Sequence, residues 1–298
     1  MKNVIIAGAS GFVGQNLNNY LKSSYEITPL SIRYFPYQQF DLKGDAIIHL
    51  SGKAHDLKKV SSPQDYYDAN FELTKQLFDS FLQSEATVFI FMSTVKAVAD
   101  AVEGILDEEF KPNPITAYGK SKLMAEEYIL QNLPHDKKVY ILRPCMIHGP
   151  GNKGNLNLLH RFVSKGIPYP FGVYENERSF LSIDNLSFII KELIDKNNIP
   201  SGIYNVADDE FISTNEVVRI IATVAGKRPN LLAVPKVIIN AVARLGDLIK
   251  APFNTESVKK LTENYRVSNK KIKHALNIET LPVTVRHGLK ATIQSFFK

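Results

Sequence analysis

Apolar residues form continuous runs in the first half of the chain, without alternating polar residues. The runs cover residues 3–8, 45–50, 87–92 and 138–143. Runs of this kind are typical of parallel strands that are buried on both faces. Segments with a helical spacing of apolar residues lie between them, at 61–84 and 115–132. The alternation predicts an α/β fold built on a doubly wound parallel sheet.

The connection from Arg33 to Asp45 is only about a dozen residues long. It has room for one short strand near residues 38–42 but not for a crossover helix on each side of that strand. We therefore predict that the sheet is trimmed in this part.

Three glycines, Gly8, Gly11 and Gly14, follow the first predicted strand and precede a helix. Gly8 permits a tight turn, Gly11 lets the backbone approach a pyrophosphate, and Gly14 lets the helix pack closely on the strand. The phosphates would then lie at the helix N-terminus, where free N–H groups favour anions. The other candidate cofactor-binding residues of this turn are Ser10, Phe12 and Val13.

The pattern changes after residue 150. Helices are predicted at 156–166, 184–196 and 213–226, short strands at 168–172 and 178–182, and a strand that can rejoin the main sheet at 202–207. Ser213 and Glu216 have the spacing of a capping box, and the remaining chain to Lys298 is predicted to be helical. We predict a Rossmann-type NAD(P)-binding domain at 1–150 plus 184–206. A smaller, mostly helical substrate-binding domain is predicted at 151–183 plus 207–298.

Tyr118 precedes Lys122 by four residues, which places both side chains on one face of the helix predicted at 115–132. A nearby ammonium favours the phenolate and lowers the pKa of a phenol. Such a tyrosine can exchange a proton near neutral pH, which an ordinary tyrosine cannot. The pair is therefore a candidate proton-transfer centre, and a helix pair without a role is the alternative.

Composition narrows the function classes. The net charge of +6 and pI of about 9.1 suit an anionic ligand, but the basic residues are scattered, which is typical of solvated surface charge and not of a nucleic-acid-binding stripe. Cys145 is the only cysteine in the sequence, so no internal disulfide can form and a reducing, cytoplasmic location is expected. No apolar stretch is long enough for a transmembrane helix.

Cys145 and His148 alone do not make a metal site, and His49 is predicted to be a core histidine.

Five segments match one family in order and spacing: GASGFVG (8–14), AIIHLSG (46–52), FIFMST (89–94), AYGKSK (117–122) and LRPCMIHGPGN (142–152). Over nearly its whole length the chain resembles the extended short-chain dehydrogenase/reductase superfamily, specifically its nucleotide-sugar epimerase/dehydratase branch. The resemblance implies that Tyr118 is the acid/base and that Lys122 holds the nicotinamide ribose and lowers the pKa of Tyr118. Thr94 would hydrogen-bond the reacting sugar oxygen, with Ser93 beside the nicotinamide; a plain strand residue is the alternative for Thr94.

The resemblance also implies further cofactor contacts. They are Asp41 and Leu42 at the adenine, Leu50, Ser51 and Gly52 under the cofactor, and Asn70 in support of the active-site helix. The alternative for Asn70 is a helix-surface position. Where NAD users carry an acidic residue for the ribose hydroxyls, this chain has Ser31, followed by Arg33. This favours NADP(H) over NAD(H), with a plain surface charge as the alternative for Arg33.

Departures from the family pattern narrow the reaction. Sugar dehydratases of this branch have Asp-Glu where this chain has Val95 and Lys96, so elimination of water lacks an acid and a base. Lys96 is either a substrate contact or a solvated loop lysine. Met146 replaces an asparagine of the UDP-galactose epimerases, which disfavours ordinary UDP-glucose/UDP-galactose interconversion. Asn155 and Arg178 match positions that contact the nucleotide diphosphate.

The segment 234–252 departs from the family's usual uridine-binding segment. Its polar residues, Lys236, Asn240, Arg244 and Asp247, form a narrow stripe on an otherwise apolar helix. One interpretation is burial in the small domain. The other is a lipid-facing surface for a polyprenyl-diphosphate sugar or a membrane-bound partner.

The resemblance implies hydride exchange at C4 of a UDP-hexose or UDP-N-acetylhexosamine, in enzymes that make N-acetylated 6-deoxyhexoses for bacterial surface polysaccharide. The departures favour a 4-ketoreductase, with a 4-epimerase that retains NAD as the alternative. A non-catalytic dinucleotide-binding sensor is the alternative of another class, and a nucleic-acid or membrane binder driven by charge is a third. Family members often dimerise through the active-site helix, so a homodimer is expected.

Overall fold

A six-stranded parallel sheet forms the centre of the protein, in the order β2-β1-β3-β4-β6-β9. The structure is a computed structural model that describes residues 1–54, 62–152, 154–249, 251 and 254–297. The strands of the sheet are β1 (Asn3–Ala7), β2 (Glu26–Leu30), β3 (Ala46–His49), β4 (Val88–Met92), β6 (Lys138–Pro144) and β9 (Gly202–Val206). The predicted doubly wound sheet is therefore confirmed, including the return of residues 202–207 to pair with β6.

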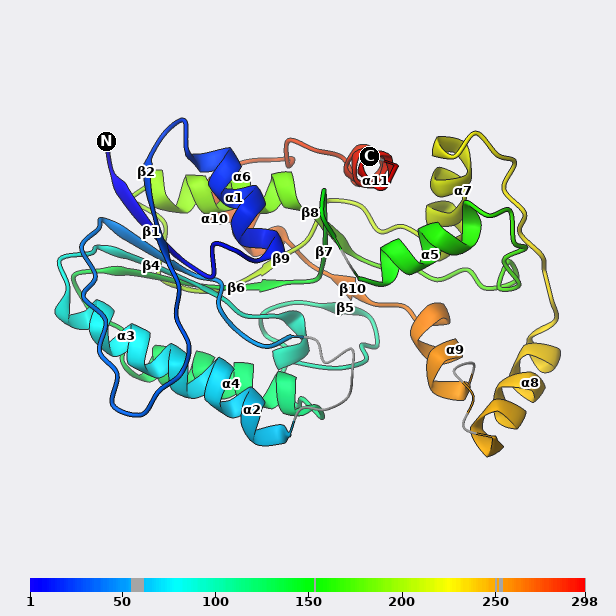
Figure 1. The fold of residues 1–298 in the computed structure, drawn as a ribbon, viewed down its shortest axis with the longest axis horizontal. Coiled ribbons are helices and arrows are strands. Elements are labelled where there is room, and N and C mark those ends of the chain that lie inside the picture. The colour runs from blue at the N-terminus through cyan, green and yellow to red at the C-terminus, as the bar shows by residue number, and fades with distance from the viewer. Residues whose placement is uncertain (55–61, 153, 250, 252–253, 298) are drawn as a thin grey trace.

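Helices cover both faces of the sheet (Figure 1). On one face lie α1 (Phe12–Leu21), α6 (Ile183–Asp195) and α10 (Lys270–Leu276), and on the other lie α2 (Pro63–Tyr67), α3 (Leu73–Gln83) and α4 (Ala117–Gln131). Neighbouring residues of a strand belong to opposite cores: Ile48 packs toward α1 and α6, whereas Ile47 packs toward α3 and α4. Both faces are apolar for this reason, and the strand runs contain no alternating polar residues.

The segment between β2 and β3 contains no strand, so the strand predicted near residues 38–42 is wrong. Here the Phe40 N–H donates to the Ser80 hydroxyl (3.1 Å), and Leu42 packs in the core under α3. These contacts attach the segment to a helix, which leaves β2 as the edge of the sheet. The prediction of a trimmed sheet is confirmed.

The smaller part of the molecule, called the small domain below, packs around a second core. Its elements include the paired strands β7 (Met146–His148) and β8 (Phe180–Ser182), together with α5 (Asn155–Val163), α7 (Thr214–Val224) and α11 (Val285–Ser295). Tyr169 and Phe171 form only isolated bridges, to Leu231 and Ala233, where a strand was predicted at 168–172.

Ser213 caps α7 as predicted, because its hydroxyl accepts from the Glu216 N–H (3.1 Å). The Glu216 carboxylate does not complete the capping box, since it pairs with Arg219 and Arg286 instead. The short strands β5 (Ile105–Leu106) and β10 (Arg266–Val267) pair with each other and connect the C-terminal part to the loop after β4.

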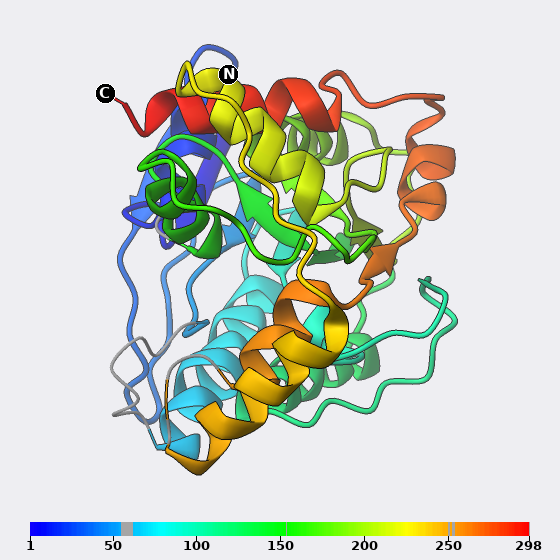
Figure 2. The same cartoon turned by 90° about the vertical axis from the view of Figure 1, so that its right-hand side faces the viewer.

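The helix α8 (Lys236–Leu248) and its neighbour α9 (Thr255–Thr262) project from the small domain (Figures 1 and 2). Only Ile239, Ala243 and Gly246 of α8 are buried. The interpretation that this helix is buried is therefore wrong for most of its apolar surface. Lys250 and Pro252, the end of the segment considered in the sequence, lie outside the described residues.

Among the described residues, no helix combines the length and apolarity that a membrane crossing requires.

Candidate active site

The glycine turn has the geometry that the sequence predicts. Gly8 adopts a φ of +90°, a left-handed conformation that favours glycine. A Cβ at position 14 would lie 2.4 Å from the Gly8 carbonyl oxygen, so only glycine lets α1 pack this closely on the strand end. The N-cap residue of α1 is Gly11, which has no side chain that could accept a hydrogen bond from the first N–H groups of the helix. These groups therefore stay available for phosphate. These features fit a dinucleotide.

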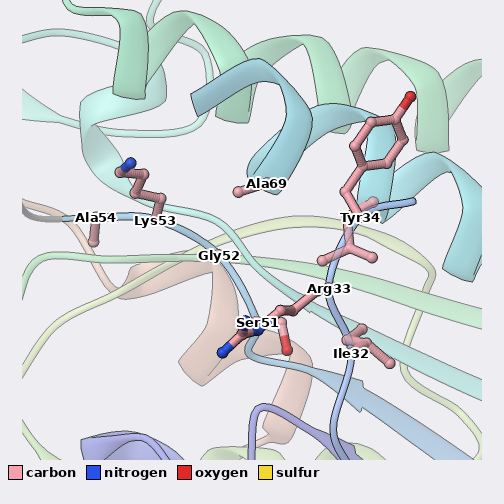
Figure 3. A pocket seen from close by; sticks show the side chains of 9 residues that line it. Ile32, Arg33, Tyr34, Ser51, Gly52, Lys53, Ala54 and Ala69 are labelled. Atoms are coloured by element: carbon pink, nitrogen blue, oxygen red, sulfur yellow. The ribbon is translucent and has the colours of Figure 1, made fainter. Parts of the chain in front are cut away.

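A pocket of about 520 Å³ lies at the carboxyl ends of β2 and β3. Its lining residues are Ile32, Arg33, Tyr34, Ser51, Gly52, Lys53, Ala54, Ala69 and Leu73. In Figure 3 the Arg33 side chain points across the pocket toward Ser51. None of these nine residues is acidic, so the pocket suits an anionic group such as a 2′-phosphate.

Other predicted cofactor residues have different positions. Ser31 is exposed at the end of β2, and Leu50 packs against the core beside the glycine turn. Asp41 forms an exposed ion pair with Lys43 (2.7 Å), and Leu42 is buried. Neither Asp41 nor Leu42 lines the pocket beside Arg33.

The side chains of Thr94 and Tyr118, which are 24 positions apart in the sequence, lie close enough for the Thr94 hydroxyl to lower the pKa of Tyr118. Thr94 follows β4, and Tyr118 lies in the first turn of α4, where Thr116 caps the helix. Gly119 makes the meeting possible, because a Cβ there would lie 2.4 Å from the Lys96 carbonyl oxygen. Sequence reasoning missed Gly119, whose role depends on a contact between distant segments.

Lys122 lies one helical turn after Tyr118 and is buried. Its ammonium donates to the Met92 carbonyl (2.8 Å) and lies 4.6 Å from the centre of the Phe91 ring. Among the described residues this carbonyl is its only hydrogen-bond acceptor, so two of its three donors remain for ribose hydroxyls. A Cβ at Gly52 would lie 3.2 Å from this ammonium, which shows how closely the loop under the cofactor approaches it.

Burial shifts the pKa values of Tyr118 and Lys122 in opposite directions. It raises the pKa of Tyr118, and the Thr94 hydroxyl opposes that rise. It lowers the pKa of Lys122 to about 8, and the Glu126 carboxylate opposes that fall. Burial dominates at Tyr118, so its pKa is raised in this structure, in the direction opposite to the sequence expectation. Tyr118 is therefore held as a phenol, the form that donates a proton.

Asn70 is fully buried, so its alternative as a helix-surface residue is wrong. It lies in a π-helical turn (Asp68–Glu72) between α2 and α3, a distortion that is frequent at functional sites. Its amide donates to the Ser121 hydroxyl (3.0 Å) and to the Lys53 carbonyl (3.0 Å), and its carbonyl accepts from the Lys53 N–H (2.7 Å). Asn70 thus links α4 to the loop at Gly52.

Behind the pair lies a buried ionic network that sequence reasoning missed. Glu126 receives two hydrogen bonds from the Arg143 Nε (3.0 and 3.1 Å), a third at 2.5 Å from Nη2, and one from the Ser93 hydroxyl. Ser93 is therefore held by α4 next to Thr94. The sequence shows that Glu126 follows Lys122 by four residues, which places both side chains on one face of the helix. No local pattern, however, pairs Glu126 with Arg143.

The predicted substrate residues do not form one cluster. Lys96 lies 4.7 Å from the centre of the Tyr265 ring and donates to the Asp100 carbonyl (2.6 Å), so it is not a free loop lysine. Arg178 forms backbone bridges to Ile212 and Tyr265, and burial lowers its pKa. Tyr265 thus connects the small domain to the loop after Thr94.

Two further substrate candidates lie elsewhere. Met146 packs against the small-domain core, and Asn155 is exposed at the first position of α5.

His49 and His148, the two histidines considered in the sequence, have structural contacts. His49 is buried, its Nε2 lies 2.9 Å from the Thr74 hydroxyl, and burial lowers its pKa to about 3, as expected of a core histidine. Its Nδ1 has no partner among the described residues. His148 lies 2.8 Å from the Thr292 hydroxyl. The described part of the chain contains no group of three or more His, Cys, Asp or Glu side chains that could hold a metal ion.

Comparison with known proteins agrees with this geometry. The sequence profile of the NAD dependent epimerase/dehydratase family matches residues 4–207. A UDP-glucose 4-epimerase of Vibrio cholerae is 31% identical and aligns over 100% of this chain and 96% of its own length. The N-acetyl-alpha-D-glucosaminyl-diphospho-ditrans,octacis-undecaprenol 4-epimerase of Escherichia coli O157:H7 is 29% identical over 72% of this chain and 70% of its own.

A solved structure shows the same fold. RMD from Pseudomonas aeruginosa, complexed with NADPH, superposes with a TM-score of 0.74, 20% identity and coverage of 99% of both chains. The relatives confirm the expectation of an NAD(P)-dependent enzyme of the nucleotide-sugar epimerase and reductase group. This chain is a member of the NAD-dependent epimerase/dehydratase family.

Proposed function

We propose that this protein transfers a hydride between a nicotinamide cofactor and C4 of a UDP-hexose or UDP-N-acetylhexosamine, and that it acts as an NADPH-dependent 4-ketoreductase. The observation that carries this proposal is the meeting of Thr94 and Tyr118, which places the Thr94 hydroxyl close enough to lower the pKa of the phenol, with Lys122 one turn further along α4. A non-catalytic sensor has no need of this arrangement.

Each residue of the trio has a role in ketone reduction. Thr94 orients the C4 oxygen by a hydrogen bond, and Tyr118 donates its proton to that oxygen. Burial raises the pKa of Tyr118, so the phenol carries the proton that reduction of a ketone requires. The Lys122 charge then favours the phenolate that remains. The cofactor supplies the hydride when it is bound.

The proposed binding of cofactor and substrate follows the two parts of the chain. Residues 1–150 plus 184–206 hold the cofactor, with the glycine turn at the pyrophosphate, Arg33 and Ser51 near the adenosine and Lys122 at the nicotinamide ribose. Residues 151–183 plus 207–298 hold the nucleotide sugar, with Arg178 at the diphosphate. We further propose a cytoplasmic homodimer that forms through α3 and α4.

The second candidate is a 4-epimerase that keeps its NAD. It is favoured by the two relatives described above, both of which are named 4-epimerases. The name of the Escherichia coli relative also raises a lipid-diphosphate-linked sugar as the substrate of this chain. The exposed apolar face of α8 supports that variant.

Identification of the nucleotide released by denaturing the purified protein separates the candidates. A ketoreductase should release little nucleotide and should oxidise added NADPH when a UDP-4-keto sugar is supplied. Stoichiometric NAD(H), together with interconversion of C4 epimers without added cofactor, would instead establish the epimerase. Absence of both activities on UDP-linked and lipid-linked sugars would refute a reaction at C4.

Replacing Arg33 by Ala should weaken NADPH binding by about 10- to 100-fold, because a charge-assisted hydrogen bond contributes roughly 1.5–3 kcal/mol. NADH affinity should not change, since NADH has no 2′-phosphate. Titration of both cofactors by fluorescence measures the effect. Arg161→Ala, which removes an exposed arginine of α5, is the matched control. Equal loss of NADPH and NADH affinity in the Arg33 variant would contradict the assignment.

A further inference from the structure

The helix α8 exposes a continuous apolar face to solvent. The large apolar side chains of this face are between 49% and 80% exposed, namely Val237, Ile238, Val242, Leu245, Leu248 and, at the C-terminal cap, Ile249. Surface patches of this kind on a water-soluble domain mark sites of interaction. We propose that α8 docks the protein on the surface of an anionic phospholipid bilayer, with these side chains in the interface.

The exposed apolar face is distinct from the face that packs on the protein. At 3.6 residues per turn, Ile238, Val242 and Leu245 follow one another on one side of the helix. The buried Ile239 and Ala243 lie on a second side, against the small-domain core. Lys236, Asn240, Arg244 and Asp247 form the third side, the polar stripe. One apolar face therefore stabilises the fold, and the other is left exposed by the residues that the structure describes.

The charge around this face complements an anionic membrane. The cations of α8 are Arg244 and Lys236, whose ammonium lies 5.2 Å from the centre of the Tyr174 ring, and Asp247 is the only acidic residue of this helix. The Asp247 carboxylate accepts a hydrogen bond from the Thr255 N–H (3.1 Å), so it is turned toward α9. Glu263, the C-cap of α9, is paired with Lys259 (3.3 Å), and Glu256 of α9 also has a partner. Lysine and arginine beside an apolar helix face are typical of helices that lie in the headgroup region.

The placement of α8 also suits a planar partner. The α8–α9 pair projects from the small domain, and α8 continues the edge formed by the segment after α7 (Figures 1 and 2). It lies beyond the carboxyl ends of the strands, at the end of the sheet where α4 begins (Figure 1). Thr94 follows β4 at the same end. A docked protein would thus turn its catalytic end toward the headgroups. The proposed homodimer uses α3 and α4, so it leaves this face open. The inference holds for either sugar carrier.

Flotation of the purified protein with vesicles tests the docking. Vesicles of phosphatidylcholine with about one-third phosphatidylglycerol should carry the protein upward, pure phosphatidylcholine should carry less, and added salt should weaken the binding. The double variant Leu245→Glu/Leu248→Glu should lose at least about tenfold in partition. Leu158→Glu, which alters an exposed leucine of α5 (62% exposed), should bind like the wild type.

Circular dichroism and the oligomeric state by light scattering accompany the flotation. Loss of partition by the double variant with an unchanged spectrum supports the docking surface. Wild-type protein that stays with the buffer, or a double variant that floats like the wild type, overturns it. A wild type that self-associates through α8 and becomes smaller in the double variant, without vesicle binding, also overturns it. None of these outcomes depends on the reaction at C4.

Discussion

Replacing Tyr118 by Phe should lower turnover by roughly 10²- to 10⁴-fold, which is the usual contribution of a positioned general acid. The Tyr118 phenol lies beside Thr94 and can donate a proton to the sugar oxygen, whereas the Lys96 N–H that donates to the Thr94 hydroxyl (3.2 Å) is a backbone amide and no acid. The phenylalanine ring keeps the shape of the site. Cofactor affinity should therefore stay within about twofold. Single-turnover rates with NADPH and a UDP-4-keto sugar, together with cofactor titration, measure both effects.

Tyr66→Phe is the matched control, because the Tyr66 ring lies 6.5 Å from the ring of Tyr118 on the neighbouring helix α2. The same atom is removed in the same region. This variant should keep its rate to within about threefold, since a hydroxyl that takes no part in proton transfer adds little to the barrier. If the Tyr118 variant retained wild-type turnover, or if both variants lost activity equally, the assigned role of Tyr118 would be wrong.

Replacing Glu126 by Gln should destabilise the protein by about 3–5 kcal/mol, because the substitution leaves the Arg143 charge buried without a counter-ion. Arg143 is 2% exposed and Glu126 is 0% exposed, so water does not screen the loss. Urea denaturation gives the free energy of unfolding, and the thermal midpoint should fall by roughly 5–15 °C. Glu192→Gln on α6 is the control, since it breaks the partly exposed pair with Lys196 and should cost less than about 1 kcal/mol.

Two companion measurements separate the ion pair from its effect on Lys122. The apolar double variant Glu126→Leu/Arg143→Met should recover much of the lost stability, because neither buried charge remains. The Glu126 carboxylate raises the pKa of Lys122, which is about 8. In Glu126→Gln the Lys122 ammonium should lose its proton at lower pH, so the alkaline limb of the pH–rate profile should move down. An unmoved limb in a folded, active variant would show that Glu126 does not act on Lys122.

The lowered pKa of Lys122 also makes the stability of the wild-type protein depend on pH. Its folded-state pKa of about 8 lies below the ordinary value of 10.5. Between these values the unfolded chain binds one more proton than the native protein, so this group contributes stability that increases as pH rises from about 8 to 10.5. Below pH 8 both states are protonated, and the cost of the buried charge is fully present.

The local features of this protein were predictable because neighbouring residues carry them. The continuous apolar runs predicted the parallel strands, and the spacing of Gly8, Gly11 and Gly14 predicted a turn that only glycine can form. The offset of four residues between Tyr118 and Lys122 is a property of any helix. The strand predicted near residues 38–42 failed because Phe40 and Leu42 contact α3, which lies about 40 positions away in the sequence.

Composition and periodicity did not predict the contacts between segments that are distant in the sequence. The approach of Gly119 to the Lys96 carbonyl brings Tyr118 to Thr94, and β6 brings Arg143 to Glu126. The exposure of α8 is of the same kind. Its apolar residues occupy more than one helix face, and a pattern of this width is compatible with burial of every apolar face. Only the packing of the chain shows which face is covered, because burial is a property of the neighbours and not of the helix itself.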